Sequence, residues 1–366
     1  MKKKILILNW RDPLDPKSGG AEKVTLKHAL RWVEEDHQVF WLSGKYAGAA
    51  EHSFDQGINF YRIGSSQTLF LRAAFIYWFK FRGDFDVVVD EVHGIPAFTP
   101  LWAFKSKKIV LIHELAGDIW NEMFGGVIGA IGRFIENSIF PFVYQKTKFW
   151  VDGKSTRDDL INIGISKKHI VIIPCAIDKV PSVKVDKEKS LTILFIARLV
   201  PMKGLHHALE VFKEILKINE RAKFYVVGDG DSNYINENKL KAKNISNQIK
   251  FWGHVTDKKK YELLAKSHFL LHTSIKEGFG LTVLEANSQH TPAAVFRVSA
   301  LKDLVEDNKT GVVAAYKDYA KLAKKITTLY VNQSKYSQMS KESYLFSKSF
   351  VWSKFTKQSL QLLESL

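Results

Sequence analysis

Short apolar runs alternate with longer helix-patterned segments along the whole of this chain. In the first half the runs are rich in β-forming residues and read KILILNW, QVFWLSG, DVVVDEV, KIVLIHEL, KFWVDG and HIVIIPC. Helix-patterned segments such as EKVTLKHALRWVEED separate them. The second half repeats the theme with LTILFIARL, KFYVVGDG, QIKFWGHV, HFLLHTS, AAVFRV and TGVVAAY. This alternation predicts an α/β fold in which helices flank parallel sheets.

A polar, lysine-rich stretch, DKVPSVKVDKEKS, separates the two halves and has no apolar periodicity. At 366 residues the chain exceeds the size at which a single core usually keeps growing, so we expect two domains. The pattern predicts a first Rossmann-like domain at residues 1–178, a linker at 179–190 and a second Rossmann-like domain at 191–345. Residues 346–366 are expected to form a helix that packs back toward the first domain.

No stretch has the pattern of a signal peptide or of a membrane span. The apolar run near the start is short and is followed by Asn9, Arg11 and Asp12, and the longer run at residues 123–143 is broken by charged residues. The single cysteine, Cys175, excludes an intramolecular disulfide and suits a reducing compartment. We therefore expect a cytoplasmic protein.

The net charge of +16, from 54 Lys and Arg against 38 Asp and Glu, favours an anionic partner. That partner can be a nucleic acid, an anionic lipid surface or a phosphorylated metabolite. No zinc-finger spacing or RNP signature is present, so we expect no nucleic acid. The segment Thr68–Arg82 interleaves aromatic residues with Arg72, Lys80 and Arg82, which is typical of a helix that lies on an anionic membrane surface. The same aromatic residues could instead pack on their own sheet.

Three glycine-containing segments could place the amino end of a helix against a phosphate, where unpaired backbone N–H groups favour an anion. The first, GGAE, contains Gly19 and Gly20, and the second, VVGDGDS, contains Gly228 and Gly230. Both are also typical of ordinary surface turns. The third segment, EGFGLTVLEA, gives the strongest indication.

In this third segment a turn is enclosed by two glutamates, Glu277 and Glu285. The turn and the helix start that follows it comprise Gly278, Phe279, Gly280, Leu281 and Thr282. The first amides of the helix would bind a diphosphate. A carboxylate can accept hydrogen bonds from two vicinal hydroxyls, so the two glutamates would hold a ribose and a hexose on either side of the phosphates.

These motifs resemble those of the family-4 glycosyltransferases of the GT-B fold. The resemblance rests on EGFGLTVLEA, ARLVPMKGLHHALEVF, YVVGDG, FWGHV and TGVVA in the second half, and on GGAE and STRDDLINIGISKKHIVIIPCAID in the first. It implies two Rossmann-like domains that face each other across a cleft. It also implies that Arg198 and Lys203 clamp the donor diphosphate, that Glu277 faces the transferred sugar, and that Glu285 faces the ribose. Gly20 is expected beside the donor as well.

In the first domain the resemblance implies that a histidine at a strand end lines the reaction centre. His113, in LIHELAGDIW, is the preferred residue, and His93, in DEVHGIP, competes for the role. Three places depart from the usual family pattern and bear on sugar specificity. They are His290 in NSQHTP, Lys302 and Asp303 in ALKDLVED, and Cys175 with Ala176 in IPCAID.

Together with the residues above, the resemblance implies a retaining glycosyltransferase that moves a hexose from a nucleoside diphosphate sugar to a glycan or lipid-linked acceptor. No convincing DxD pattern is present, so neither a metal ion nor another cofactor is expected; Arg198, Lys203 and the helix dipole would neutralise the leaving diphosphate. The enzyme is expected at the inner face of the membrane. Two alternatives stay open: a nucleotide-sugar epimerase or hydrolase on the same fold, and a non-catalytic sugar-nucleotide-binding subunit.

Overall fold

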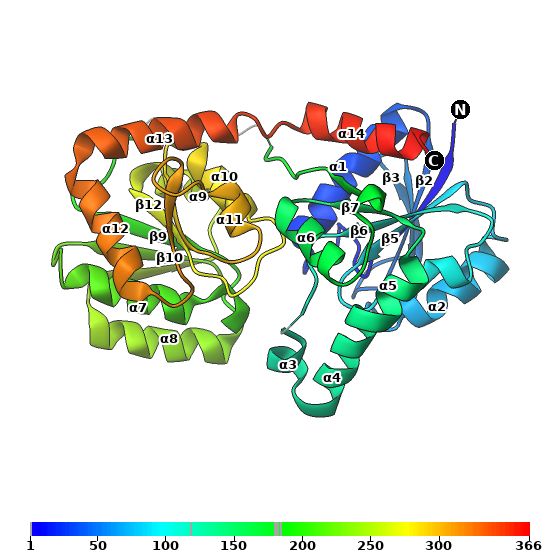
Figure 1. The fold of residues 1–366 in the computed structure, drawn as a ribbon, viewed down its shortest axis with the longest axis horizontal. Coiled ribbons are helices and arrows are strands. Elements are labelled where there is room, and N and C mark those ends of the chain that lie inside the picture. Colours follow the sequence, from blue (N-terminus) through cyan, green and yellow to red (C-terminus); the bar gives the residue numbers. More distant parts are fainter. Residues whose placement is uncertain (1, 118, 179–182, 184) are drawn as a thin grey trace. The chain divides into compact units, whose positions relative to one another are not determined.

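The computed structural model describes residues 2–117, 119–178, 183 and 185–366, with the backbone alone for residues 121–123. The chain divides into two compact units (Figure 1). The N-terminal unit contains Met1–Cys175 and Trp352–Leu366, and the C-terminal unit contains Ala176–Val351. The segment expected as a linker, residues 179–190, falls within the C-terminal unit, and its residues 179–182 and 184 lie outside the described residues.

The N-terminal unit is built on an eight-stranded sheet with the order β3-β4-β2-β1-β5-β6-β7-β8. Its strands are β1 (Lys4–Leu8), β2 (Gln38–Ser43), β3 (His52–Asp55), β4 (Ile58–Arg62), β5 (Val87–Val92), β6 (Lys107–Ile112), β7 (Lys148–Val151) and β8 (Ile170–Ile172). All neighbours pair in parallel except β3, which is antiparallel to β4. The β3–β4 hairpin was not predicted. It turns at Gln56 and Gly57, which both have positive φ, as a tight two-residue hairpin turn requires.

Helices cover this sheet, and the last helix of the chain belongs to the same unit. They are α1 (Gly20–Glu34), α2 (Leu69–Phe75), α3 (Ile119–Phe124), α4 (Gly126–Phe134), α5 (Phe140–Tyr144), α6 (Lys154–Asn162) and α14 (Trp352–Glu364). Short 3₁₀ turns occur at Thr99–Leu101 and Lys167–His169, and π-helical turns, η1 (Ile76–Lys80) and η3 (Ile135–Ile139), follow α2 and α4.

The packing of α14 on α1 is polar as well as apolar. The hydroxyl of Ser359 lies 2.8 Å from Nδ1 of His28 and accepts a 3.1 Å hydrogen bond from the Trp32 indole. His28 is fully buried, with its ring edge-on to those of Trp150 and Trp352. These contacts fix the C-terminal helix to the first helix of the chain.

The C-terminal unit has a six-stranded, fully parallel sheet with the order β11-β10-β9-β12-β13-β14. Its strands are β9 (Thr192–Ile196), β10 (Lys223–Val227), β11 (Ile249–Gly253), β12 (Phe269–His272), β13 (Ala293–Phe296) and β14 (Gly311–Ala314). Its helices are α7 (Leu205–Leu216), α8 (Ser232–Ile245), α9 (Asp257–Lys266), α10 (Leu281–Asn287), α11 (Leu301–Leu304), α12 (Tyr319–Val331) and α13 (Gln333–Ser347), with a 3₁₀ turn at Pro201–Lys203. This order is that of a Rossmann fold, so the prediction of two Rossmann-like α/β domains is confirmed.

Each sheet has one point where the direction of strand addition reverses. In the N-terminal sheet it lies between β1 and β5, and in the C-terminal sheet between β9 and β12. In open parallel sheets a ligand binds outside the carboxyl ends of the strands at such a switch point. The loops that leave these four strands are therefore where functional side chains are expected.

Candidate active site

Two loops meet at the switch point of the C-terminal sheet. The N–H of Ile275, after β12, donates to the carbonyl of Met202, after β9, at 3.0 Å. The hydroxyl of Thr273 donates to the carbonyl of Gly204 at 2.8 Å. Gly204 has a φ of +73°, and a Cβ at this position would lie 2.1 Å from the carbonyl oxygen of Thr273. Only glycine permits so close an approach, and these contacts hold the two loops in a fixed position relative to each other.

These joined loops bring Lys203 and Glu277 together. Nζ of Lys203 donates to Oε2 of Glu277 at 2.5 Å, and Nε2 of His272 lies 3.3 Å from Oε1 of the same carboxylate. Burial alone would raise the pKa of Glu277, but the charge of Lys203 and the hydrogen bond from His272 outweigh it and lower that pKa to about 2. The structure thus places next to each other the two residues that the sequence assigned to the diphosphate and to the transferred sugar.

The second glutamate lies on α10, beyond the turn. Oε1 of Glu285 accepts a 2.8 Å hydrogen bond from Nζ of Lys260 on α9. Burial would lower the pKa of Lys260, but the neighbouring carboxylate of Glu285 raises it. Sequence reasoning did not find Lys260, which stands 25 positions before Glu285.

The turn between the two glutamates depends on one glycine rather than two. Gly280 has a φ of +96° and directly precedes α10, whereas Gly278 is not among the described residues with positive φ. The ring of Phe279 is buried and packs against Phe350, so this residue could meet a ligand only through its backbone. Leu281 and Thr282 open the helix, and the hydroxyl of Thr282 is buried without a hydrogen-bond partner among the described residues.

Arg198 leaves the end of β9 as an exposed side chain with no ion pair to any described residue. The backbone next to it is firmly held, because the N–H of Leu199 donates to the carbonyl of Asp229 at 2.8 Å. A Cβ on Gly228 would lie 1.8 Å from the carbonyl oxygen of Ala197. Gly228 thus allows the loop after β10 to pack against the carboxyl end of β9. The exposed guanidinium of Arg198 is free to bind an anion.

In the N-terminal unit, the two glycines after β1 lie at the start of α1. Gly20 is the first residue of this helix and is exposed, and the N–H of Gly19 donates to Oε2 of Glu22 at 2.7 Å. The other oxygen of Glu22 accepts a 2.8 Å hydrogen bond from the indole of Trp10. The carboxylate therefore ties the helix start to the loop after β1.

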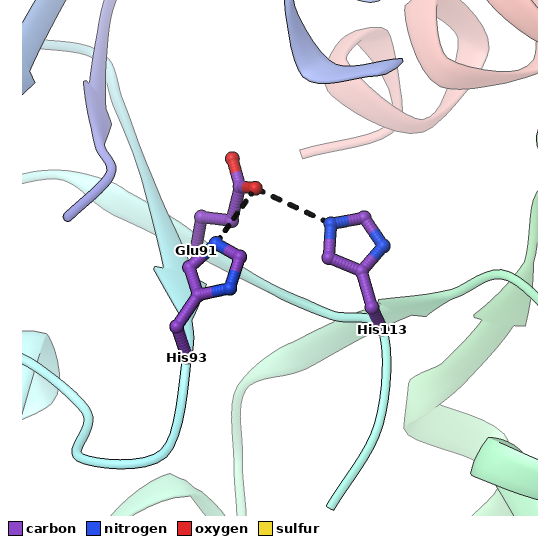
Figure 2. A group of neighbouring side chains, drawn as sticks. All are labelled: Glu91, His93 and His113. Atoms are coloured by element: carbon purple, nitrogen blue, oxygen red, sulfur yellow. Dashed lines mark hydrogen bonds and ion pairs between the residues drawn. The ribbon is translucent and has the colours of Figure 1, made fainter. Parts of the chain in front are cut away.

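The carboxyl ends of β5, β6 and β7 form a cluster of ionisable side chains (Figure 2). Oε1 of Glu91 lies 3.0 Å from Nε2 of His93 and 3.2 Å from Nε2 of His113. Nδ1 of His113 lies 2.5 Å from Oδ2 of Asp152. The ring of His93 stacks on the indole of Trp10, with ring centres 5.0 Å apart.

Both ring nitrogens of His113, the preferred histidine, face carboxylates. Burial would lower the pKa of His113, but the charge and hydrogen bonds of Asp152 and Glu91 raise it well above its usual range. Burial would likewise raise the pKa of Glu91, but the hydrogen bonds from His113 and His93 outweigh burial and lower that pKa to about 2. His113 thus has no ring nitrogen free for a substrate proton, whereas Nδ1 of His93 has no partner among the described residues. The catalytic role expected for His113 stays a prediction.

Two family models together cover most of the chain. Residues 18–179 match the model described as Glycosyltransferase Family 4, and residues 177–346 match Glycosyl transferases group 1. The chain belongs to the family-4 glycosyltransferases. The GT-B fold predicted from the sequence is confirmed, and membership of this family supports the predicted transferase activity.

The relatives of this glycosyltransferase are distant in sequence. An uncharacterized glycosyltransferase of Haemophilus influenzae is 27% identical over 347 residues, which cover 91% of this chain and 93% of the relative. Poly(glycerol-phosphate) alpha-glucosyltransferase of Bacillus subtilis is 26% identical over 60% of this chain, and alpha-monoglucosyldiacylglycerol synthase of Streptococcus pneumoniae is 23% identical over 62%. The match spans only 32% and 55% of the length of these last two proteins.

Solved structures share the fold of this glycosyltransferase over its full length. HepE from Anabaena in complex with UDP-glucose has a TM-score of 0.75 at 18% identity, with all of both chains covered. Sucrose-phosphate synthase from Thermosynechococcus elongatus has a TM-score of 0.78 at 13% identity, covering 100% of this chain and 99% of the other. Within the described residues, no helix is both long and apolar enough to cross a bilayer.

Proposed function

We propose that this glycosyltransferase transfers a hexose from a nucleoside diphosphate sugar to a glycan or lipid-linked acceptor, with retention of anomeric configuration. The observation that carries the proposal is the Lys203–Glu277 pair at the C-terminal switch point. An ammonium group can neutralise the oxygens of a diphosphate leaving group, and a carboxylate can accept hydrogen bonds from sugar hydroxyls. The pair thus supplies, side by side, the two kinds of contact that a sugar nucleotide needs.

The remaining donor contacts come from the same edge of the C-terminal sheet. The exposed guanidinium of Arg198 would bind the diphosphate with Lys203, and the first N–H groups of α10 would bind it from the other end. Glu285 would accept the ribose hydroxyls. Because these groups supply the positive charge that a diphosphate needs, the donor requires no Mg²⁺ on this proposal.

In the proposed reaction the acceptor hydroxyl attacks the anomeric carbon on the face from which the diphosphate departs. The bond between the anomeric carbon and the diphosphate oxygen breaks, and the hydroxyl proton passes to a diphosphate oxygen. Lys203 and Arg198 stabilise the charge that develops on that leaving group. Glu277, whose low pKa keeps it ionised, positions the sugar.

A donor screen followed by a turnover assay tests this proposal. UDP, GDP and ADP sugars are compared by thermal shift, with UDP-glucose first because HepE was solved with that ligand. The best donor is then incubated with the isolated chain, with and without glycan and lipid-linked acceptors, and the anomeric proton of the product is observed by NMR. Transfer that needs an acceptor supports the proposal. Conversion of the donor without an acceptor indicates an epimerase or hydrolase, and donor binding without turnover indicates a binding subunit.

We also propose that the N-terminal unit binds anionic membranes peripherally. The segment Thr68–Arg82 divides into two faces: Tyr77 is fully buried against its own sheet, whereas Leu71, Phe75 and Phe79 are 65 to 74% exposed. The exposed cations of this segment are Arg72, Lys80 and Arg82. A helical segment with an apolar face flanked by cations can bind in the headgroup region of an anionic bilayer.

A second apolar surface lies on α3, α4 and α5, which extend from the sheet (Figure 1). Its large exposed side chains are Phe124, Val127, Ile128, Ile131, Phe134 and Phe142. The opposite side of this segment is anchored, because the buried carboxylate of Glu136 accepts hydrogen bonds from the N–H of Gly117 at 2.6 Å and from the Trp120 indole at 3.2 Å. A monomeric soluble surface rarely exposes so many large apolar groups together, which favours a lipid surface as their partner.

Flotation with lipid vesicles tests membrane binding. The protein is expected to float with vesicles that contain anionic lipid at low salt, and less at high salt, because exposed charges are screened. Phe75→Ser combined with Phe79→Ser should reduce flotation, whereas Leu240→Ser, which removes an equally exposed apolar side chain from the C-terminal unit, should not. Absence of lipid-dependent flotation at low salt would make a soluble acceptor the better interpretation.

A further inference from the structure

The cluster at the ends of β5 and β6 contains three side chains whose ligand atoms converge. Glu91 offers a carboxylate oxygen, and His93 and His113 each offer a ring nitrogen; these three atoms lie within 4.8 Å of one another. Figure 2 shows both rings turning a nitrogen toward the Glu91 carboxylate. One carboxylate and two imidazoles form a donor set that divalent transition metals bind well.

The spacing of these atoms is close to that of a metal site. Oε1 of Glu91 is 3.0 Å from Nε2 of His93 and 3.2 Å from Nε2 of His113. Ligands that lie about 2.0–2.1 Å from a tetrahedral zinc ion are separated from each other by roughly 3.3 Å. Both distances from Glu91 are therefore within a few tenths of an ångström of those in a zinc site, and the two histidine nitrogens, which lie within 4.8 Å of each other, would move closer together around a cation.

Two further features of the cluster favour the binding of a cation. Nδ1 of His113 lies 2.5 Å from Oδ2 of Asp152, so this nitrogen carries the proton and Nε2 is the atom that points at Glu91. A carboxylate that orients a histidine in this way is the usual outer partner of a metal ligand. Glu91 is only 5% exposed, and its second oxygen, Oε2, has no hydrogen-bond partner among the described residues. A buried carboxylate oxygen without a partner is costly, and a cation that Glu91 binds through both of its oxygens would satisfy it.

We propose that Glu91, His93 and His113 bind one divalent transition-metal ion of the zinc class, with Asp152 as the residue that positions His113. The nitrogen ligands favour such an ion over Mg²⁺ or Ca²⁺, which prefer oxygen. Three protein ligands leave a coordination position open for water or for a hydroxyl of a bound molecule. The site belongs to the N-terminal unit and does not depend on how the donor is bound, so it is independent of the proposed function.

Metal titration of the full-length chain tests the site directly. After treatment with EDTA and its removal, Co²⁺ is added and its visible absorption is recorded, and Zn²⁺ is measured by calorimetry and by displacement of Co²⁺. One ion per chain is expected, with no displacement by a large excess of Mg²⁺. Glu91→Gln and His93→Phe should each lower the affinity for Zn²⁺ at least about tenfold, and Asp152→Asn should lower it by roughly 10- to 100-fold.

The variants are chosen so that a folding defect does not hide the result. His93→Phe keeps an aromatic ring to stack on Trp10 while removing the ligand nitrogen, and its thermal melt checks that the fold survives. His254→Ala, which removes an exposed histidine from the C-terminal unit, should bind Zn²⁺ like the parent. The proposal would be overturned if the chain bound no ion at a ratio of one per chain. Equal affinity for Zn²⁺ in the parent, Glu91→Gln and His93→Phe would overturn it as well.

Discussion

Replacement of Lys203 by methionine should sharply reduce donor turnover. The substitution keeps most of the length of the side chain and removes the charge that lies 2.5 Å from Glu277. It leaves the carboxylate of Glu277, whose side chain is 12% exposed, with the His272 ring as its remaining partner. Both the diphosphate and the carboxylate thus lose the same counter-charge.

The size of the effect follows from the acidity of Glu277. Its pKa falls from 4.5 to about 2, and this corresponds to about 3 kcal/mol, at about 1.4 kcal/mol for each tenfold change in acidity. The charge of Lys203 is the largest single cause of the lowering, and a loss of roughly 2–4 kcal/mol in transition-state stabilisation is consistent with removal of one preorganised charge. The expected fall in kcat/KM is about 30- to 900-fold.

The assay is initial-rate transfer from the donor that the screen identifies, with the parent, Lys203→Met and Lys223→Met measured side by side. Lys223 also pairs with a glutamate, at 3.0 Å, but lies at the amino end of β10, away from the switch point. Lys223→Met should stay within about threefold of the parent, since a partly exposed ion pair contributes little. A kcat/KM of Lys203→Met within threefold of the parent, with the authentic donor, would refute the assignment.

Further substitutions test other parts of the structure. Arg198→Ala should cost roughly 2–4 kcal/mol in kcat/KM while the fold survives, and near-normal transfer would contradict its place in the clamp. Glu285→Gln should weaken calorimetric binding of the free nucleoside diphosphate, whereas Glu277→Gln should mainly impair the intact donor; equal effects on the free nucleotide would remove this division of roles. Burial lowers the pKa of His28 to about 3, so this group should cost no stability above about pH 6.5 and about 2 kcal/mol by pH 5; thermal melts of His28→Gln should show a weaker pH dependence than the parent, and parallel curves would contradict this. Gly204→Ala should destabilise the chain by roughly 2–4 kcal/mol, because φ is +73° and a Cβ would meet the carbonyl of Thr273; an unchanged Tm would contradict the close approach.

The sequence predicted the strands that lie in apolar runs, most of which are buried on both faces. All twelve apolar runs are strands, because a parallel sheet covered by helices leaves no polar face and its strands become nearly continuous hydrophobic segments. The β3–β4 hairpin was missed for the opposite reason. His52–Asp55 is an edge strand whose side chains are mostly polar and none of which is buried, and its turn uses Gln56 before Gly57 rather than the usual Asn or Asp.

The candidate site was predicted where a motif is contiguous and missed where its parts come from separate strands. EGFG and the lysine of PMKG are visible in the sequence, but His272, Lys260 and Asp152 become partners only when strands and helices are in register. The signal that could have found His272 and Asp152 is their position directly at or after the last residue of a buried strand, since carboxyl ends of parallel strands share one edge. Phe279 shows the opposite case: it stands inside a motif predicted to bind the donor, but its side chain is buried and packs against Phe350.

Both units place a buried carboxylate at the switch point of their sheet and surround it with lysine or histidine side chains. Without Lys203 and His272, burial would raise the pKa of Glu277 and push this group toward its neutral form. With them, the group stays ionised down to a pH of about 2. A sugar in transfer develops positive charge at its anomeric carbon while negative charge grows on the leaving diphosphate. On the proposed function, a permanently ionised Glu277 and its Lys203 partner oppose these two charges at once, which gives a physical reason for a glutamate to stand immediately before the turn.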